Sequence, residues 1–254
     1  MVSNYSSAVK KAMLIYPDGN CAVIYGLEFC SDVNYAVPGN PSKFSTSKDL
    51  AKFYDDQAKE SYDNFDKALQ QIPCEIANTG QFSLARTCDD CAKAYKSWLC
   101  TTMIPRCQDY SRSDPWLQPR NIAQAFPNGS MSAPELLGMD TGALASLSLN
   151  SSRNPKIDEM VQPGPYKEIL PCQDLCYNLV QSCPAAMGFS CPRPGMMGFE
   201  AAYGYRPNGS VGEEGMVTCN YPGAAYHLSR AAVVEPVGWL VFVVASVGSI
   251  QLVL

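Results

Sequence analysis

Twelve cysteines in a chain of 254 residues are the feature that most restricts what this protein can fold into. Cytosolic proteins seldom carry so many cysteines without a metal, whereas domains outside the cytoplasm pair them as disulfides. Cys88 and Cys91 have the C-x-x-C spacing of a zinc site or a redox dithiol, but no second such pair follows and His227 is the only histidine. We therefore expect an extracytoplasmic, disulfide-stapled domain that uses no metal or other cofactor.

Charge and the placement of acidic residues exclude further classes of function. The net charge of -5 argues against a nucleic-acid partner, because phosphate binding needs a basic surface. Nucleophilic catalysis usually needs a histidine base, and His227 lies beyond the last cysteine. The pairs Asp55–Asp56 and Glu213–Glu214 lie in polar segments, so we expect them to be solvated rather than to act as glycosidase carboxylates. We expect no enzyme activity.

Four N-x-[ST] sequons support a secretory route and predict glycans at Asn4, Asn128, Asn150 and Asn208. Three of the four lie in stretches rich in Pro, Gly and Ser, which are typical of surface loops. The N-terminal extension, residues 1–16, lacks the apolar core of a signal peptide. We infer that the sequence is the C-terminal portion of a longer precursor or a chain that has lost its start.

The C-terminal residues 237–254 are uncharged and mostly apolar, and they are barely long enough to span a bilayer. Small residues begin at Gly223, and a spacer over residues 223–236 leads to this tail. That order is typical of a lipid-anchor signal with attachment at Gly223. The alternative is a membrane helix that is retained. Both interpretations attach the protein to a membrane.

Helical periodicity predicts three helices. The first spans residues 45–72, begins at a cap on Thr46 or Ser47 and ends at Pro73. We expect its apolar stripe to pack on the core, with a partner-binding face as the alternative. A second helix is expected over residues 87–101, and a third begins near Pro171, a residue favoured in a first helical turn. A short strand is expected at residues 23–25.

The stretch between residues 108 and 166 contains no cysteine and is rich in Pro, Ser, Asn and Gly. It predicts a long surface loop insertion with at most a short helix at 133–137 or 142–149. Of the aromatic residues near the cysteines, we expect Trp98 to pack in the core and Trp116 to anchor a loop. The alternative is a ligand-binding face that would also include Tyr95 and Tyr177.

The order and spacing of the cysteines as a whole resemble the frizzled-type cysteine-rich domain. The resemblance is carried by the run from Cys91 to Cys107 and by Pro171-Cys172-x3-Cys176-x6-Cys183. It implies a disulfide-rich, mainly α domain over residues 17–222, with short β segments. It also implies five bonds, to which the two remaining cysteines add a sixth. The pairs are Cys21–Cys107, Cys30–Cys100, Cys91–Cys183, Cys172–Cys219, Cys176–Cys191 and, as the sixth, Cys74–Cys88.

A narrower resemblance covers most of the chain. The runs FCSDVNYAVPGN from Phe29, AYKSWLCTTMIPRC from Ala94 and YKEILPCQDLC from Tyr166 resemble the C-terminal half of the fungal stretch-activated calcium-channel component, the family tied to mating-pheromone-induced death. That family is similar to auxiliary subunits of the animal sodium-leak channel.

This resemblance implies a glycosylated regulatory subunit on the extracellular face of the plasma membrane, reached through the secretory pathway. Its partner would be a pore-forming calcium-channel subunit of four repeats. One alternative is that the chain itself forms the stretch-activated pore, although one apolar segment offers no polar-lined conduction path. Another is a frizzled-like module that binds a lipid or secreted ligand.

Overall fold

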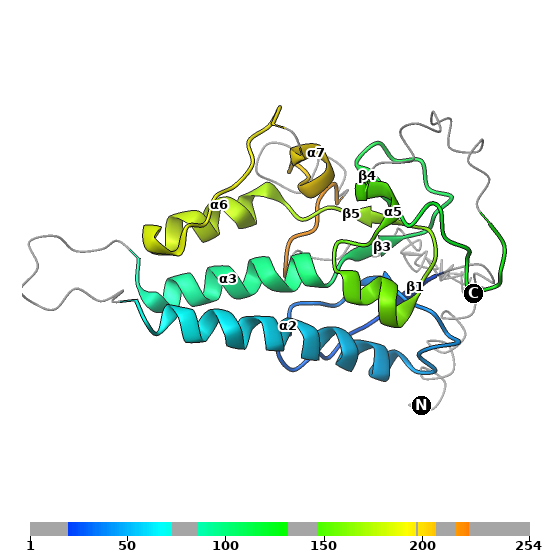
Figure 1. Ribbon diagram of the computed structural model, residues 1–254, viewed down its shortest axis with the longest axis horizontal. Helices are drawn as coiled ribbons and strands as arrows, with labels where there is room; N and C mark the ends of the chain where they lie inside the picture. The colour runs from blue at the N-terminus through cyan, green and yellow to red at the C-terminus, as the bar shows by residue number, and fades with distance from the viewer. Residues whose placement is uncertain (1–19, 73–85, 132–146, 197, 207–216, 224–254) are drawn as a thin grey trace, which may run out of the picture.

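The computed structural model describes residues 20–72, 86–131, 147–196, 198–206 and 217–223 (Figure 1). Several expectations fall outside these residues. They are the extension 1–16, Cys74, the candidate helix at 133–137, the sequons at Asn4 and Asn208, and the tail 237–254.

Two long helices form where the periodicity predicts them. Helix α2 spans Ser47–Leu69, and the Thr46 side chain caps it by accepting from the Asp49 amide. Helix α3 spans Cys88–Met103 and begins with a reciprocal capping box between Thr87 and Asp90. Such caps satisfy amide groups that the first turn leaves without a helical partner.

The third helix, α6, spans Gln173–Ser182; Cys172 is its N-cap residue but makes no capping bond through its side chain. Pro171 therefore precedes the helix instead of occupying its first turn, and it forms a parallel bridge with Asn220. The shorter helical segments are α5 (Leu147–Asn150), the π-helical turn η2 (Ile157–Val161), the 3-10 turn η3 (Ala185–Met187) and α7 (Phe199–Ala202).

The strands make two small antiparallel sheets. Strand β1 (Cys21–Val23) pairs with β2 (Ala36–Pro38). The strand expected at residues 23–25 therefore lies two residues earlier in the chain. The chain turns at Gly26, which has a φ of 69°, a conformation that favours glycine. In the second sheet β5 (Tyr166–Ile169) lies between β3 (Arg106–Gln108) and β4 (Leu117–Arg120).

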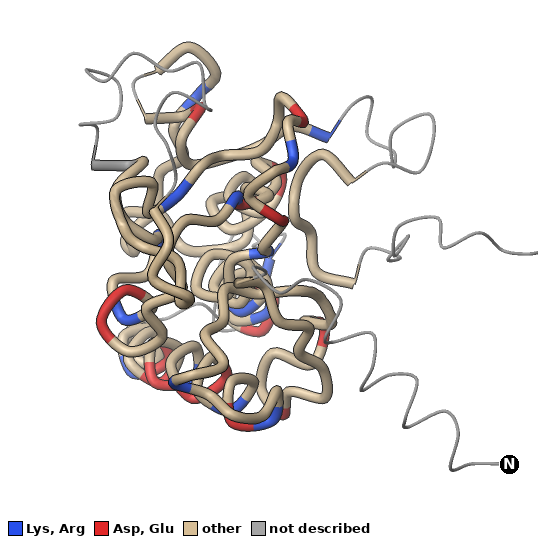
Figure 2. Tube along the Cα trace, turned by 90° about the vertical axis from the view of Figure 1, so that its right-hand side faces the viewer, with Lys and Arg blue, Asp and Glu red and all other residues tan. Residues whose placement is uncertain are grey.

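Helix α3 lies between α2 and α6, and the three-stranded sheet lies beyond one end of this helical layer (Figure 1). The buried residues of α2 include Leu50, Tyr54, Phe65 and Leu69, so its apolar stripe packs on the core as expected. Its outer face carries i,i+4 ion pairs such as Lys52–Asp56. In Figure 2 charged residues gather at the bottom of the view, where α2 lies in Figure 1.

The cysteine-free stretch is a surface loop in only part of the residues that the structure describes. Residues 109–116 and 123–131 are irregular and largely exposed, but the expectation is wrong for the strands and helical turns between and after them. Strand β4 is paired along its length with β5. Leu117, Ile122, Ile157 and Val161 are buried. The helix expected at 142–149 is represented by the short α5, and residues 132–146 lie outside the described residues.

A buried ionic cluster holds this stretch where no disulfide reaches it. Glu168 on β5 has no exposed side-chain surface, and its two carboxylate oxygens accept from Arg120 Nε at 2.6 Å and Arg153 Nε at 2.9 Å. The same two arginines donate to the carbonyls of Ala201 and Ala202 in α7. We call Arg120, Arg153 and Glu168 the ionic hub. It joins β4, the segment after α5, β5 and α7.

A second buried network lies beside the ionic hub. The Asp158 carboxylate accepts from the amide and the hydroxyl of Ser152 and from the side-chain amide of Asn121. Tyr166, which is fully buried, donates its hydroxyl to Ser152. The polar composition that resembles a loop in sequence is therefore used for internal hydrogen bonding.

The ionic hub makes the first prediction. Glu168→Gln leaves the buried Arg120 and the partly buried Arg153 without their counter-charge, so the free energy of unfolding should fall by about 3–5 kcal/mol. Glu159→Gln is the matched control, because Glu159 is exposed and lies in the same stretch, and its effect should stay within about 0.5 kcal/mol. Denaturant unfolding of the oxidised protein measures both, and equal effects would contradict the role of the hub.

The hub also predicts acid sensitivity. Burial by itself raises the pKa of Glu168, but Arg153 and Arg120 outweigh it, so the pKa is lowered from its ordinary value of 4.5. A lowered folded-state pKa contributes stability above the unfolded-state pKa, and this contribution is lost as the pH falls below about 4.5. Unfolding measured between pH 7 and pH 3 should show this loss in the wild type and a smaller slope in Glu168→Gln.

Candidate functional site

The structure contains five disulfides in the described residues, and they are the same five pairs that the frizzled-type resemblance implies. Cys88 is disulfide-bonded as well, and Cys74, the partner expected for it, lies outside the described residues. The described part of the chain has no free cysteine. The pairs are Cys21–Cys107, Cys30–Cys100, Cys91–Cys183, Cys172–Cys219 and Cys176–Cys191.

Helix α3 is the element on which these bonds converge. Near its start Cys91 is bonded to Cys183 at the end of α6, and near its end Cys100 is bonded to Cys30 in the N-terminal segment. These bonds close loops of 92 and 70 residues. Closing long loops restricts the unfolded chain and stabilises the fold by about 2–4 kcal/mol for each bond in the chain-entropy account.

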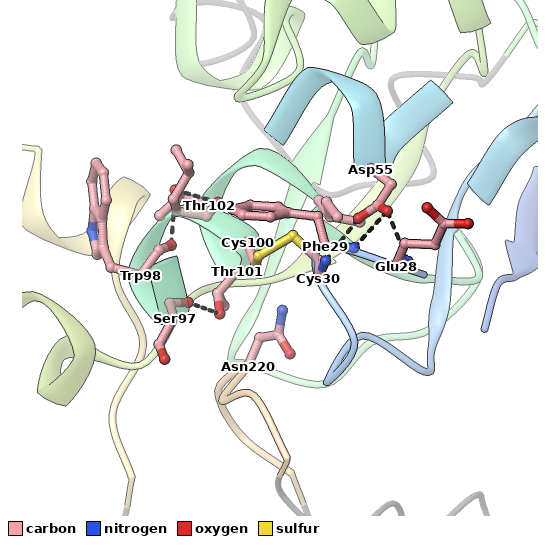
Figure 3. The surroundings of a disulfide bond; sticks show 12 residues. Glu28, Phe29, Cys30, Asp55, Ser97, Trp98, Cys100, Thr101, Thr102 and Asn220 are labelled. Carbon is pink, nitrogen blue, oxygen red and sulfur yellow. Dashed lines mark hydrogen bonds between the residues drawn. A yellow bond between two sulfur atoms is a disulfide. The ribbon is translucent and has the colours of Figure 1, made fainter. Parts of the chain in front are cut away.

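The surroundings of Cys30–Cys100 are shown in Figure 3. Asp55 points from α2 toward the Cys30 segment, and its carboxylate accepts from three successive backbone amides. The amides of Glu28, Phe29 and Cys30 lie 2.9, 2.8 and 2.7 Å from it. The expectation that Asp55 and Asp56 are both solvated is therefore wrong for Asp55, which is 9% exposed. It is correct for Asp56, which is exposed.

The hydroxyl groups on the buried side of α3 are satisfied within the helix itself. Thr101 donates to the Ser97 carbonyl at 2.8 Å, and Thr102 donates to the Trp98 carbonyl at 3.0 Å (Figure 3). Trp98 is half-buried against Cys176 and Phe199. Both threonine hydroxyls thus have partners within the protein.

Two of the candidate ligand-face aromatics are used in packing instead. Trp98 donates its indole N–H to the Tyr203 hydroxyl at 2.9 Å. The Tyr95 ring stacks on Phe65 of α2 with ring centroids 3.6 Å apart. The core role expected for Trp98 is confirmed, and these two residues do not form an open binding face.

The Tyr35 side chain connects the N-terminal segment to the end of α3 and to the last described segment of the chain. The Tyr35 hydroxyl donates to the Ile104 carbonyl at the end of α3 and accepts from the Asn220 side chain, at 2.7 and 3.1 Å. The backbone N–H of Asn220 also donates to the Leu170 carbonyl. We call Tyr35, Ile104 and Asn220 the central joint. It attaches residues 217–223, which we call the C-terminal strap, to the disulfide framework.

The sequons in the described residues differ in accessibility. Asn128 is exposed in a turn that Gly129 closes with a φ of 83°. Asn150 is half-buried, and Ser152, the hydroxyl residue of its sequon, is buried within the Asp158 network. Gly223, the expected anchor position, is exposed at the end of the C-terminal strap.

The described residues contain no group of three or more His, Cys, Asp or Glu side chains placed to hold a metal ion. Within the same residues, no helix combines the length and the apolar character needed to cross a membrane. The five disulfides and the helices that they join define a disulfide-rich, mainly helical module.

Comparison with known proteins identifies the family. The family model of the stretch-activated Ca2+-permeable channel component, Mid1, matches residues 10–225, and the chain belongs to this family. The stretch-activated cation channel yam8 of Schizosaccharomyces pombe is 41% identical over 225 residues, which cover 89% of this chain and 39% of that protein. The stretch-activated cation channel MID1 of Saccharomyces cerevisiae is 36% identical over 173 residues, 68% of this chain and 26% of that protein.

The chain thus spans well under half the length of either relative. Both relatives are named as channels and neither as an enzyme. No solved structure matches the chain. The frizzled-like assignment therefore stays a prediction, while the disulfide-rich and largely helical character is confirmed.

Asp55 makes a prediction about the Cys30 segment. Asp55→Asn replaces one acceptor oxygen by an amide that faces a backbone donor, which should lower the free energy of unfolding by about 1–3 kcal/mol. The neighbouring Asp56→Asn removes only an exposed pair with Lys52 and should cost less than about 0.5 kcal/mol. Hydrogen exchange of the amides at 28–30 should accelerate in the first variant alone. Unchanged exchange there would show that the carboxylate is not needed.

The sequons make a prediction about glycan occupancy. Asn128 should be glycosylated and Asn150 should not, because Ser152 accepts from Tyr166 and donates to Asp158 inside the fold. Deglycosylation in heavy-oxygen water followed by peptide mass spectrometry reads out both sites. A glycan at Asn150 in the secreted, oxidised protein would mean that this network is open when the sugar is added.

Proposed function

We propose that this chain is the cysteine-rich extracellular part of a regulatory subunit of a plasma-membrane stretch-activated calcium channel. It supports calcium influx by docking on the extracellular side of a pore-forming subunit of four repeats. The observation that carries the proposal is the match of residues 10–225 to the family of stretch-activated Ca2+-permeable channel components. Membership of that family supports a role in a channel complex at a membrane.

The disulfide framework supports a docking role in particular. Its bonds join α3 to α6 and to the N-terminal segment, and Asp55 fixes that segment to α2. A surface held this rigidly loses little conformational entropy when it binds a partner. The framework also suits the oxidising extracellular face that the sequons indicate.

Attachment to the membrane belongs to the same proposal. Either a lipid anchor at Gly223 or a retained helix at residues 237–254 would hold the module at the plasma membrane after the secretory pathway. The fold over residues 17–222 would be of the frizzled type.

One alternative has a specific observation in its favour. Both relatives are named as stretch-activated cation channels, which supports a chain that forms the pore itself. Purified full-length protein, reconstituted alone in bilayers and stretched, separates the two ideas. A regulatory subunit gives no stretch-gated current, and a current from the pure protein would favour the alternative.

The alternative of a lipid-binding module has less support. A hollow on the outer face of α2 is lined by polar and charged side chains, among them Lys59, Asp63 and Lys67, rather than by the apolar residues that a lipid chain needs. The apolar stripe of α2 faces the core.

The proposal is tested in the fungal membrane with the full-length, epitope-tagged protein. Mild-detergent purification should recover the pore-forming subunit together with the tagged protein. Deletion of the gene should reduce stress-induced calcium uptake, and the wild-type gene should restore it. A matched control is another membrane-anchored glycoprotein with the same tag. Failure to recover the pore-forming subunit even after chemical cross-linking would contradict the proposal.

A further inference from the structure

Charge is distributed unevenly over the helical layer. Helix α2 has ten charged residues among its 23, whereas the described residues from Leu170 to Gly223 contain only Asp174, Arg193, Glu200 and Arg206. Because α3 separates α2 from α6, the two regions face away from each other (Figure 1). The tube in Figure 2 shows the same contrast, with charges crowded around α2.

A patch of tyrosines surrounds the point where the C-terminal strap leaves this charge-poor side. Tyr205 is 42% exposed and Val180 is 38% exposed. Tyr177, Arg206 and Tyr221 are half-exposed. We call Tyr177, Val180, Tyr205, Arg206 and Tyr221 the exit patch. Tyr177 and Val180 are three residues apart on α6 and so share one face of the helix.

Contacts hold three members of the exit patch, Tyr205, Arg206 and Tyr221, in place. The Arg206 guanidinium lies 4.1 Å from the centre of the Tyr221 ring, and its Nε lies 3.5 Å from the Asp174 carboxylate. The Thr218 hydroxyl donates to the Tyr205 carbonyl at 2.7 Å. Tyr205 also packs on the fully buried Phe199, with ring centroids 5.1 Å apart.

The disulfide Cys172–Cys219 fixes the C-terminal strap to the start of α6, directly beneath the exit patch. A β-carbon at Gly204 would lie only 2.9 Å from the Cys219 side chain. The segment that follows α7 therefore approaches the C-terminal strap closely. The exit patch is therefore a preformed surface, and binding through it costs little ordering.

The composition of the exit patch matches the centre of a protein–protein interface. Such centres are enriched in Tyr, Met and Arg and depleted of other charged residues, because unpaired charges are costly to desolvate. A partner that complements the exit patch must itself be uncharged and apolar at the contact, with an acceptor for Arg206. All but Asp55 of the ten charged residues on α2 lie outside its buried face, and they make that outer face a poor match for such a partner.

The length of chain beyond the C-terminal strap indicates where this partner lies. Thirteen residues, 224–236, separate Gly223 from the apolar tail. Fully extended they reach at most about 45 Å. A lipid attached at Gly223 itself would also hold the patch near the bilayer. The exit patch is thus kept at the height of the outer loops of a membrane-embedded protein.

We propose that the exit patch is the surface through which this chain docks on the extracellular loops of the pore-forming subunit. The inference rests on the proposed function, and it adds which face makes the contact and that the contacted surface is uncharged and apolar.

The test changes one side chain of the exit patch at a time in the full-length protein, either by inserting a charge or by removing an aromatic ring. Val180→Asp, and separately Tyr205→Ser, should reduce co-purification of the pore-forming subunit and calcium uptake by roughly tenfold. Met160→Asp and Tyr25→Ser are the matched controls, because Met160 is 54% and Tyr25 is 65% exposed outside the patch. Both controls should behave like the wild type. Secretion and mobility on non-reducing gels verify that every variant folds.

The outcomes separate the two proposals. If the wild type recovers the pore-forming subunit and the patch variants recover it equally well, the exit patch is not the docking face although the proposed function stands. If the wild type recovers no pore-forming subunit, the proposed function fails and the docking face fails with it. If the control variants lose association as strongly as the patch variants, the contact is not confined to the patch and the inference is wrong.

Hydroxyl-radical footprinting separates a protein partner from lipid. The full-length chain is reconstituted in phosphatidylcholine vesicles with and without the pore-forming subunit. Protection of Tyr205 relative to Tyr25 only when the pore-forming subunit is present supports the proposal. Equal protection in vesicles without it would assign the exit patch to the lipid surface and overturn the inference.

Discussion

Helix α3 is bonded covalently to α6 and to the N-terminal segment, and the rest of the module depends on that arrangement. The bond from Cys91 holds α6 against it, and the bond from Cys100 holds the N-terminal segment against it. Helix α2 has no cystine in this layer and is attached by packing and by the Asp55 carboxylate. Disulfides, apolar packing and charge-assisted hydrogen bonds thus together stabilise the layer of three helices.

Buried ion pairs stabilise the part of the chain that carries no cysteine. The stretch between Cys107 and Cys172 contains no cysteine, and its described parts are joined by the ionic hub around Glu168 and the polar network around Asp158. The two kinds of bond respond to different conditions. Reducing agents break disulfides in the helical layer and also Cys21–Cys107, which ends in β3, whereas acid acts on the ionic hub beside β4 and β5. A buried cluster of this kind is costly to assemble, but it defines one arrangement of β4, β5 and α7.

Much of the helical layer is predictable from sequence, because its signals are local. Thr46 and Thr87 mark the helix starts, and apolar spacing marks the buried face of α2. The pairing of the cysteines came from a family resemblance, since spacing alone permits many connectivities. The burial of Asp55 and the pairing of Arg120 with Glu168 were not predictable, because their partners lie 25 and 48 residues away and only the tertiary fold brings them together.

The disulfide between Cys172 and Cys219 also determines how a mechanical load would travel through the module. A pull applied at Gly223 reaches Cys219 within four residues and crosses the sulfur bridge to Cys172, next to β5. The covalent path therefore bypasses everything between those two cysteines, including α6 and α7. A load applied at Gly223 would thus reach the three-stranded sheet and the central joint, and Tyr221 is the one member of the exit patch that lies on this path.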